Sequence, residues 1–202
     1  MCSSDLARRI AHEIKNPLTP IQLSAERLKR KYGREVTSDP EVFSQCTDTI
    51  IRQVGDIGRM VDEFSSFARM PQPVIRPEQA QELVRHAVFL QRVANSQIAF
   101  EIKAPREPIT FECDGRLVSQ ALTNVIKNAG EAIGARVATG DDTPGRITIS
   151  LEVKGDKLSI AVRDNGIGLP MQQRHRLTEP YVTTRAKGTG LGLAIVRKIF
   201  ED

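Results

Sequence analysis

Two long stretches in the first 70 residues repeat apolar residues at steps of three and four, the spacing of a helix packed along one face. The first comprises Ile10, Ile14, Leu18, Ile21, Ala25 and Leu28, and the second comprises Phe43, Cys46, Ile50, Val54, Ile57, Val61, Phe64 and Ala68. Gly33 ends the first helix, and the turn-forming residues 37–40 open the second. Because two helices alone cannot enclose a core, we expect this hairpin to pair with a second copy as a four-helix bundle.

Three prolines at positions 71, 73 and 77 interrupt the pattern and predict a linker over residues 70–77, between a domain at 1–69 and a domain at 78–202. In the second domain some segments space their apolar residues as helices do and others alternate them as strands do. Helical spacing covers residues 78–94, 117–135 and 190–200, whereas alternation at period two predicts strands at 98–102, 109–113, 147–153 and 158–162. The segregation of helices from strands favours an α+β sandwich.

Composition excludes several classes of protein. The net charge of +4 is spread along the chain, which disfavours a nucleic-acid-binding surface. No apolar run approaches the roughly 20 residues that span a bilayer. Cys2, Cys46 and Cys113 lie far apart, which disfavours a disulfide framework or a zinc site and fits a reducing compartment.

His12 is the first residue with candidate chemistry. It lies off the apolar seam of the first helix and is followed by Glu13, and Pro17 and Pro20 predict a bend just after it. An outward imidazole beside a carboxylate can act as a nucleophile. The alternative is an ordinary surface histidine in front of a helix that starts at Pro17.

Asn124 and Asn128 lie one turn apart in the middle of an otherwise apolar helix, where asparagine is a mediocre helix former. A neutral amide oxygen suits Mg²⁺, which takes few protein ligands and lets phosphate oxygens complete its shell. The alternative is a polar face exposed to solvent.

Two glycine-rich segments complete the set of candidates. Residues 164–168 read Asp-Asn-Gly-Ile-Gly after a strand, where an aspartate can accept a hydrogen bond from an amino group such as that of adenine. Residues 188–192 read Gly-Thr-Gly-Leu-Gly before a helix, where backbone N–H groups can hold phosphate. The preceding residues 183–187 add hydroxyl groups and two cations.

In this order, the motifs resemble those of the sensor histidine kinases of two-component systems. Residues 12–18 are similar to the H box, 124–129 to the N box, 164–168 to the first glycine box, 179–185 to the F box and 188–192 to the second glycine box. Residues 8–28 resemble the NtrY-like nitrogen-regulation kinases most. The resemblance implies a dimeric helical hairpin followed by a Bergerat-type α+β sandwich that binds ATP, and it implies a sheet that continues beyond Asp202.

The resemblance also implies roles for residues. His12 would attack the γ-phosphate of ATP, Glu13 would take up its proton, and Asn16 would orient water for dephosphorylation. Asn128 would hold Mg²⁺, and Asp164 would contact the adenine amino group. The expected nucleotide-binding residues are Asn124, Lys127, Asp164, Gly166, Gly168, Thr183, Thr184, Arg185, Lys187, Gly188, Gly190, Leu191 and Gly192.

The expected partners are a second copy of the chain and a response regulator of the NtrX type. This fragment would be cytoplasmic, with membrane and sensor segments before His12. Two departures are the F-box pair Tyr181-Val182 and Glu131, which stands where many relatives carry lysine. Two rivals stay open: a clamp ATPase of the same superfamily, although Asn124 occupies the position of its catalytic glutamate, and a non-catalytic scaffold that docks a regulator.

Overall fold

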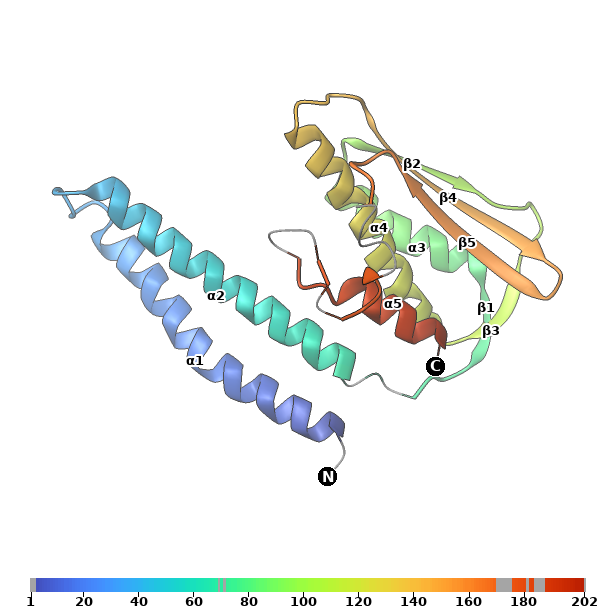
Figure 1. Cartoon of the computed structure of the whole chain (residues 1–202), viewed down its shortest axis with the longest axis horizontal. Helices are drawn as coiled ribbons and strands as arrows, with labels where there is room; N and C mark the ends of the chain where they lie inside the picture. Colours follow the sequence, from blue (N-terminus) through green and yellow to red (C-terminus); the bar gives the residue numbers. More distant parts are fainter. Residues whose placement is uncertain are drawn as a thin grey trace. The chain divides into compact units, whose positions relative to one another are not determined.

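The computed structural model describes residues 3–68, 70, 72–169, 176–180, 182–183 and 188–201. The chain divides into two units, a helical unit of residues 1–71 with 185–189 and an α+β unit of residues 72–184 with 190–202. Figure 1 labels the elements, whose bounds are α1 Ser3–Tyr32, α2 Pro40–Ala68, β1 Arg76–Gln79, α3 Ala80–Ala94, β2 Ile98–Lys103, β3 Thr110–Cys113, α4 Gly115–Ala138, β4 Gly145–Lys154, β5 Lys157–Asp164 and α5 Gly192–Glu201.

The helical unit is an antiparallel hairpin of α1 and α2 (Figure 1). The chain leaves α1 at Gly33, whose N–H donates to the carbonyl of Lys29 over 3.1 Å. A Cβ at Gly33 would lie 2.5 Å from that carbonyl oxygen, so glycine is required for the turn. Pro40 is the first residue of α2, where the missing N–H of proline costs nothing. These observations confirm the predicted end of the first helix and start of the second.

The predicted apolar seam is only partly buried within one chain. Between the two helices the chain buries small residues, namely Ala11 and Ala25 of α1 and Val54 and Val61 of α2. The larger members of the predicted seam are exposed in the single chain, namely Ile10, Ile14, Ile21 and Leu28 of α1 and Ile50 and Ile57 of α2. Periodicity found the apolar side of each helix, but this side consists of two neighbouring stripes, and only one of them packs within the hairpin.

The α+β unit contains two sheets. In the larger sheet β4 is central, with β2 parallel on one side and β5 antiparallel on the other. In the smaller sheet β1 pairs antiparallel with β3. The hairpin between β4 and β5, which joins the two predicted strands, turns at Gly155 with φ of +63°.

Helices α3 and α4 cover one face of the larger sheet (Figure 1). Alternate residues of β4 point into this layer, and Ile147 and Ile149 are fully buried there together with Val84 of α3 and Ile126 of α4. This alternation is the physical basis of the predicted α+β sandwich, which the structure confirms.

Strand β1 was not predicted. Its sequence, Arg-Pro-Glu-Gln, has no apolar alternation, and it occupies residues that were interpreted as linker and helix start. Pro77 is accommodated because β1 pairs only with β3 and is therefore an edge strand.

Two further predictions concern composition. Within the described residues, no helix combines the length and hydropathy that a membrane span requires. Cys46 is an exposed free thiol, and Cys113 is a buried one whose pKa is raised to about 11 by burial and by neighbouring carboxylates. Cys2 lies outside the described residues.

Candidate active site

His12 is exposed on the surface of α1, as are Glu13 and Asn16. The helix is continuous from Ser3 through both prolines, which excludes a helix that starts at Pro17. At 100° per residue, His12 lies roughly 180° around the helix from the exposed stripe that includes Ile14. The imidazole is therefore accessible on a side of α1 that faces away from this stripe.

The carboxylate of Glu13 does not contact the imidazole. It accepts a hydrogen bond from Arg9 Nε over 3.1 Å, one helical turn earlier. Lys15, on the inner side of α1, pairs with Asp62 of α2. The predicted pairing of Glu13 with His12 would therefore require Glu13 to leave Arg9.

In the α+β unit, Asn124 and Asn128 lie half-buried on one face of α4. The amide of Asn124 donates to the carbonyl of Gly192 over 3.4 Å, so it contacts the start of α5. A Cβ at Gly192 would lie 3.9 Å from Nδ2 of Asn128. The structure therefore brings both asparagines and Gly192 together.

The segment after β5 meets the same face of α4 one turn further on, at Ala132. The N–H of Ile167 donates to the carbonyl of Ala132 over 3.0 Å. A Cβ at Gly166 would lie 2.5 Å from the backbone of Ala132, so only glycine allows this approach. Asp164 is exposed, and its Oδ1 accepts a hydrogen bond from the N–H of Gly166 over 2.8 Å.

The start of α5 has the predicted glycine-rich geometry. Gly190 has φ of +70°, and Gly168 in the other loop has φ of +81°. Leu191 is fully buried, and its carbonyl accepts the N–H of Ile195 over 2.8 Å. The glycines thus let the chain turn into α5 while Leu191 anchors that turn in the core.

The remaining predicted residues are more dispersed. Lys127 is exposed and lies 3.9 Å from the carboxylate of Glu131. Thr183 is exposed, and Gly188 is grouped with the helical unit. Thr184, Arg185, Lys187 and the F-box residue Tyr181 lie outside the described residues.

The chemistry of this face fits Mg²⁺ bound through few protein atoms. Within the described parts of the chain, no group of three or more His, Cys, Asp or Glu could hold a metal ion. Asn128 offers a neutral oxygen, and Mg²⁺ usually completes its shell with phosphate oxygens and water. A metal ion on this face would therefore depend on a phosphate-bearing ligand.

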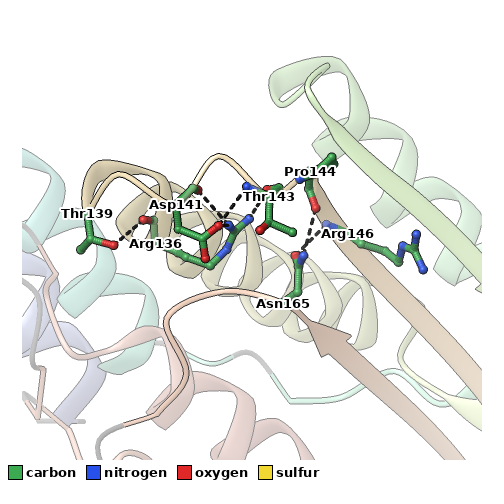
Figure 2. Close-up of polar contacts among 7 residues, drawn as sticks. All are labelled: Arg136, Thr139, Asp141, Thr143, Pro144, Arg146 and Asn165. Carbon is green, nitrogen blue, oxygen red and sulfur yellow. Dashed lines mark hydrogen bonds and ion pairs between the residues drawn. The ribbon is translucent and has the colours of Figure 1, made fainter.

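Sequence reasoning missed two residues that organise the rim of this site (Figure 2). Asn165 donates to the carbonyl of Pro144 over 2.9 Å and accepts the N–H of Arg146 over 2.8 Å. Arg136, a buried residue of α4, donates to the carbonyls of Asp141 and Thr143 in the loop between α4 and β4. An asparagine directly after Asp164 was the available signal, since asparagine commonly bonds backbone in turns.

A cleft of about 560 Å³ opens elsewhere in the α+β unit, between β1, α3 and the start of α4. It is lined by Arg76, His86, Asp114 and Arg116 among others, and by none of the predicted site residues. The buried Asp114 is fully engaged there: it caps α4 at Arg116 and Leu117 and accepts the N–H of Val74. Its partners make it a structural group, so the cleft does not compete with the asparagine face as a site.

Comparisons with known proteins agree with this division of the chain. Residues 3–73 match the model of the "His Kinase A (phospho-acceptor) domain". Residues 113–202 match the model of the "Histidine kinase-, DNA gyrase B-, and HSP90-like ATPase". The first match includes His12, and the second includes Asn124, Asn128, Asp164 and the glycine-rich segments.

Among curated proteins, nitrogen regulation protein NtrY of Azorhizobium caulinodans is 64% identical over 200 residues, which are 98% of this chain and 26% of that protein. The sensory histidine kinase/phosphatase NtrB of Rhizobium meliloti is 36% identical, over 96% of this chain and 51% of that protein. The chain thus spans about a quarter of the length of NtrY.

Solved structures of histidine kinases share the fold. Histidine kinase ThkA in complex with response regulator protein TrrA matches with a TM-score of 0.63 and 26% identity, over 96% of this chain and 53% of that one. Full-length ShkA in complex with AMPPNP matches with a TM-score of 0.69 and 22% identity, over 98% of this chain and 40% of that one.

Proposed function

Since the chain belongs to the sensor histidine kinases and is similar to their NtrY-type members, we propose that it transfers the γ-phosphoryl group of ATP to its own His12. The phosphoryl group then passes to an aspartate of a response regulator. The domains that do this are residues 1–69 for dimerisation and phosphotransfer and residues 78–202 for ATP, joined by residues 70–77.

The convergence of three segments on one face of α4 carries this proposal. Asn124 and Asn128 face the start of α5, and Gly166 packs on Ala132 one turn further on. An aspartate at a strand end, a pair of amides and a glycine-opened helix start therefore line one surface. A nucleotide can use all three groups. The aspartate can accept the amino group of the base, the amides can hold a metal ion bound to the phosphates, and the N–H groups at the helix start can bind phosphate oxygens directly.

We assign the binding roles accordingly. Asp164 Oδ1 is engaged by Gly166 N–H, which leaves Oδ2 to accept the adenine amino group. Asn128 supplies an oxygen to Mg²⁺, which when bound neutralises charge on the β- and γ-phosphates. Gly190, Leu191 and Gly192 shape the phosphate pocket, and Lys127 supplies a cation near it.

At His12 a ring nitrogen attacks the γ-phosphorus, the bond from that phosphorus to the β–γ bridging oxygen breaks, and ADP leaves. The proton of the attacking imidazole passes to Glu13, which first exchanges its partner Arg9 for His12. Both groups are exposed, so they are accessible to ATP. Most of the rate then comes from positioning and charge stabilisation.

The exposed stripe of isoleucines on the hairpin supports a homodimer, because a two-helix unit leaves large apolar side chains in water until a second copy covers them.

The response regulator is of the NtrX type and approaches His12 from the side of α1 that carries the exposed imidazole. Transfer takes place in the cytoplasm, and the parent protein is anchored in the bacterial inner membrane by segments before His12.

We also propose a phosphatase activity in which Asn16 orients a water molecule against the phosphorylated regulator. Asn16 is exposed on the helix that carries His12, one turn further along. An Asn16→Ala variant should still accept phosphate at His12 but should dephosphorylate the regulator at least tenfold more slowly. Dephosphorylation at the wild-type rate would exclude this role.

The deciding experiment is incorporation of label from γ-labelled Mg·ATP into the chain, compared with the His12→Gln variant. The label should be stable in base and labile in acid, and it should be absent from His12→Gln. Asn128→Ala should also abolish it, whereas hydrolysis by a clamp ATPase would continue without His12.

The rival functions give different results. Release of labelled phosphate that His12→Gln leaves unchanged would indicate an ATPase, although the amide of Asn124 cannot serve as its base. ATP binding without any label, in a folded dimer that still binds a regulator, would indicate a scaffold.

A further inference from the structure

We propose that Asn165 is a positioning residue that fixes Asp164 for recognition of the adenine amino group, and that Arg136 supports it from behind. The inference rests on the proposed nucleotide site and adds a determinant of base selectivity to it.

Asn165 makes three hydrogen bonds to the start of β4 and the residue before it, and Figure 2 shows the two that its side chain makes. Its Nδ2 donates to the carbonyl of Pro144 over 2.9 Å, and its Oδ1 accepts the N–H of Arg146 over 2.8 Å. Its own backbone N–H donates to the carbonyl of Arg146 over 3.3 Å. An amide that donates and accepts at once fixes both the side chain and the backbone that carries it.

The loop that receives Asn165 is itself held in place. Arg136 Nη1 donates to the carbonyl of Asp141 over 2.9 Å and lies 2.7 Å from the carboxylate of Asp141, while Nη2 donates to the carbonyl of Thr143. Hydrogen bonds from Thr143 and the charge of Arg136 hold the pKa of Asp141 below its usual range. The planar guanidinium thus ties the chain just before Pro144 to α4.

Asp164 lies between these contacts. On its C-terminal side, Asn165 is tied to β4 and Ile167 is tied to Ala132 of α4. On its N-terminal side it is the last residue of β5, opposite Ile147 in the ladder with β4. Its carboxylate is exposed, so the surrounding protein does not fix it through burial. Its orientation depends on the N–H of Gly166, which donates to Oδ1 over 2.8 Å, and on Asn165, which holds the backbone between Asp164 and Gly166.

The test compares the affinity of two nucleotides for the full chain in Mg²⁺ by calorimetry. One is ATP, and the other is purine-riboside triphosphate, which has hydrogen in place of the amino group. In Asn165→Ala we expect ATP affinity to fall about tenfold and the affinity for the second nucleotide to change by less than about twofold. Asn165→Asp, which keeps the acceptor but loses the donor to Pro144, should behave like Asn165→Ala.

The ratio of the two dissociation constants in one sample does not depend on the fraction of folded protein, so partial unfolding of a variant does not mimic the effect. Asn95→Ala is the matched control: Asn95 is also half-buried, and its amide also donates to a backbone carbonyl, that of Gln91. We expect Asn95→Ala to leave the ratio unchanged.

A double variant tests whether Asn165 acts through Asp164. If Asn165 acts through Asp164, then Asn165→Ala should have little further effect on ATP affinity once Asp164→Asn is present. Equal weakening of both nucleotides by Asn165→Ala, or full additivity with Asp164→Asn, would overturn the positioning role alone. If Asp164→Asn leaves the preference for ATP intact, the adenine contact itself is wrong, and this proposal is overturned with it.

Discussion

The two units differ in how a single chain packs isoleucines along their helices and strands. In the α+β unit Ile126, Ile147, Ile149 and Leu191 are fully buried. In the hairpin the buried apolar residues are alanines and valines, whereas five isoleucines are about 40% exposed or more, namely Ile10, Ile14, Ile21, Ile50 and Ile57. The α+β unit thus completes its own core, whereas the hairpin needs an outside surface to complete its core.

This difference has a thermodynamic consequence. A unit that closes its core within one chain has a stability independent of protein concentration. A unit that closes it against a second copy gains stability as concentration rises, because dimerisation stabilises the folded state by mass action. The units should therefore respond differently to substitution and to dilution.

The largest effect is expected from charges placed in the exposed stripe of α1. The double variant Ile14→Asp/Ile21→Asp changes two residues in each copy of the chain. It therefore replaces four isoleucines of the proposed dimer interface with four carboxylates. Each buried isoleucine contributes roughly 1.5–3 kcal/mol, so the dimer dissociation constant should rise by at least 100-fold. Analytical ultracentrifugation measures it.

Leu23→Asp is the matched control, because Leu23 is 59% exposed but lies on the other flank of α1. It should leave the dimer intact. If both changes dissociate the dimer equally, or if neither does, the stripe is not the interface.

The next effect is in the core of the α+β unit. Ile149→Ala, at a position with no exposed surface in β4, should lower the free energy of unfolding of this unit by about 3 kcal/mol. Urea unfolding at two protein concentrations should give the same loss. Val153→Ala, on the same strand but 52% exposed, should cost less than about 0.5 kcal/mol. A concentration-dependent loss for Ile149→Ala would contradict a self-contained core.

A smaller effect is expected at Asp114, which joins the start of α4 to the chain before β1. Its carboxylate accepts from Arg116, from Leu117 and from Val74. Asp114→Asn keeps one acceptor but loses the charge, so at pH 7 it should cost about 2 kcal/mol. Urea unfolding at pH 7 and in acid measures the loss.

The pH dependence has a definite sign. The side chain of Arg116, followed by the N–H of Val74, holds the pKa of Asp114 well below its usual range. The stabilisation is therefore complete above the unfolded pKa, about 4, and is lost as pH falls through the lower folded value. The cost of Asp114→Asn should shrink below pH 4. Asp156→Asn, in the exposed turn between β4 and β5, is the control.

Sequence patterns predicted most elements, since helical and strand periods are strong where one face is buried. They missed β1 because its pairing with β3 is made by backbone groups, and its side chains carry no period. The patterns also did not separate the two apolar stripes of each hairpin helix, because helical periodicity shows which side of a helix is apolar but not which surface packs against it. Ala11 packs within the chain while Ile10, one residue earlier, does not.

The candidate site shows the same limit. Asn124, Asn128, Asp164 and Gly192 were predictable, since each residue type has a specific chemical use in its local motif. Arg136 was not, because a basic residue in the last turn of a helix is usually explained by the helix dipole. Its hydrogen-bond acceptors lie in the loop between α4 and β4, and no local sequence pattern predicts the path of that loop. The hydrogen bond of Asn165 to Pro144 was unpredictable for the same reason.

The smallest effect is expected from the ion pair of Lys29 with Asp48, which joins α1 to α2 at the surface. Both side chains remain more than 40% exposed, so solvent and salt screen the attraction. The hydrogen bond from Lys29 lowers the pKa of Asp48, so the contribution is present above pH 4 and is lost as pH falls.

Lys29→Gln should therefore shift the melting temperature of the hairpin by about 2 °C or less, and 1 M NaCl should remove the difference. Arg30→Gln, which removes an equal charge without a partner within the described residues, is the control. A large and salt-resistant loss for Lys29→Gln would mean that polar contacts hold the two helices together. A small loss, next to the large effect of Ile14→Asp with Ile21→Asp, leaves the apolar surface supplied by a second copy as the main source of hairpin stability.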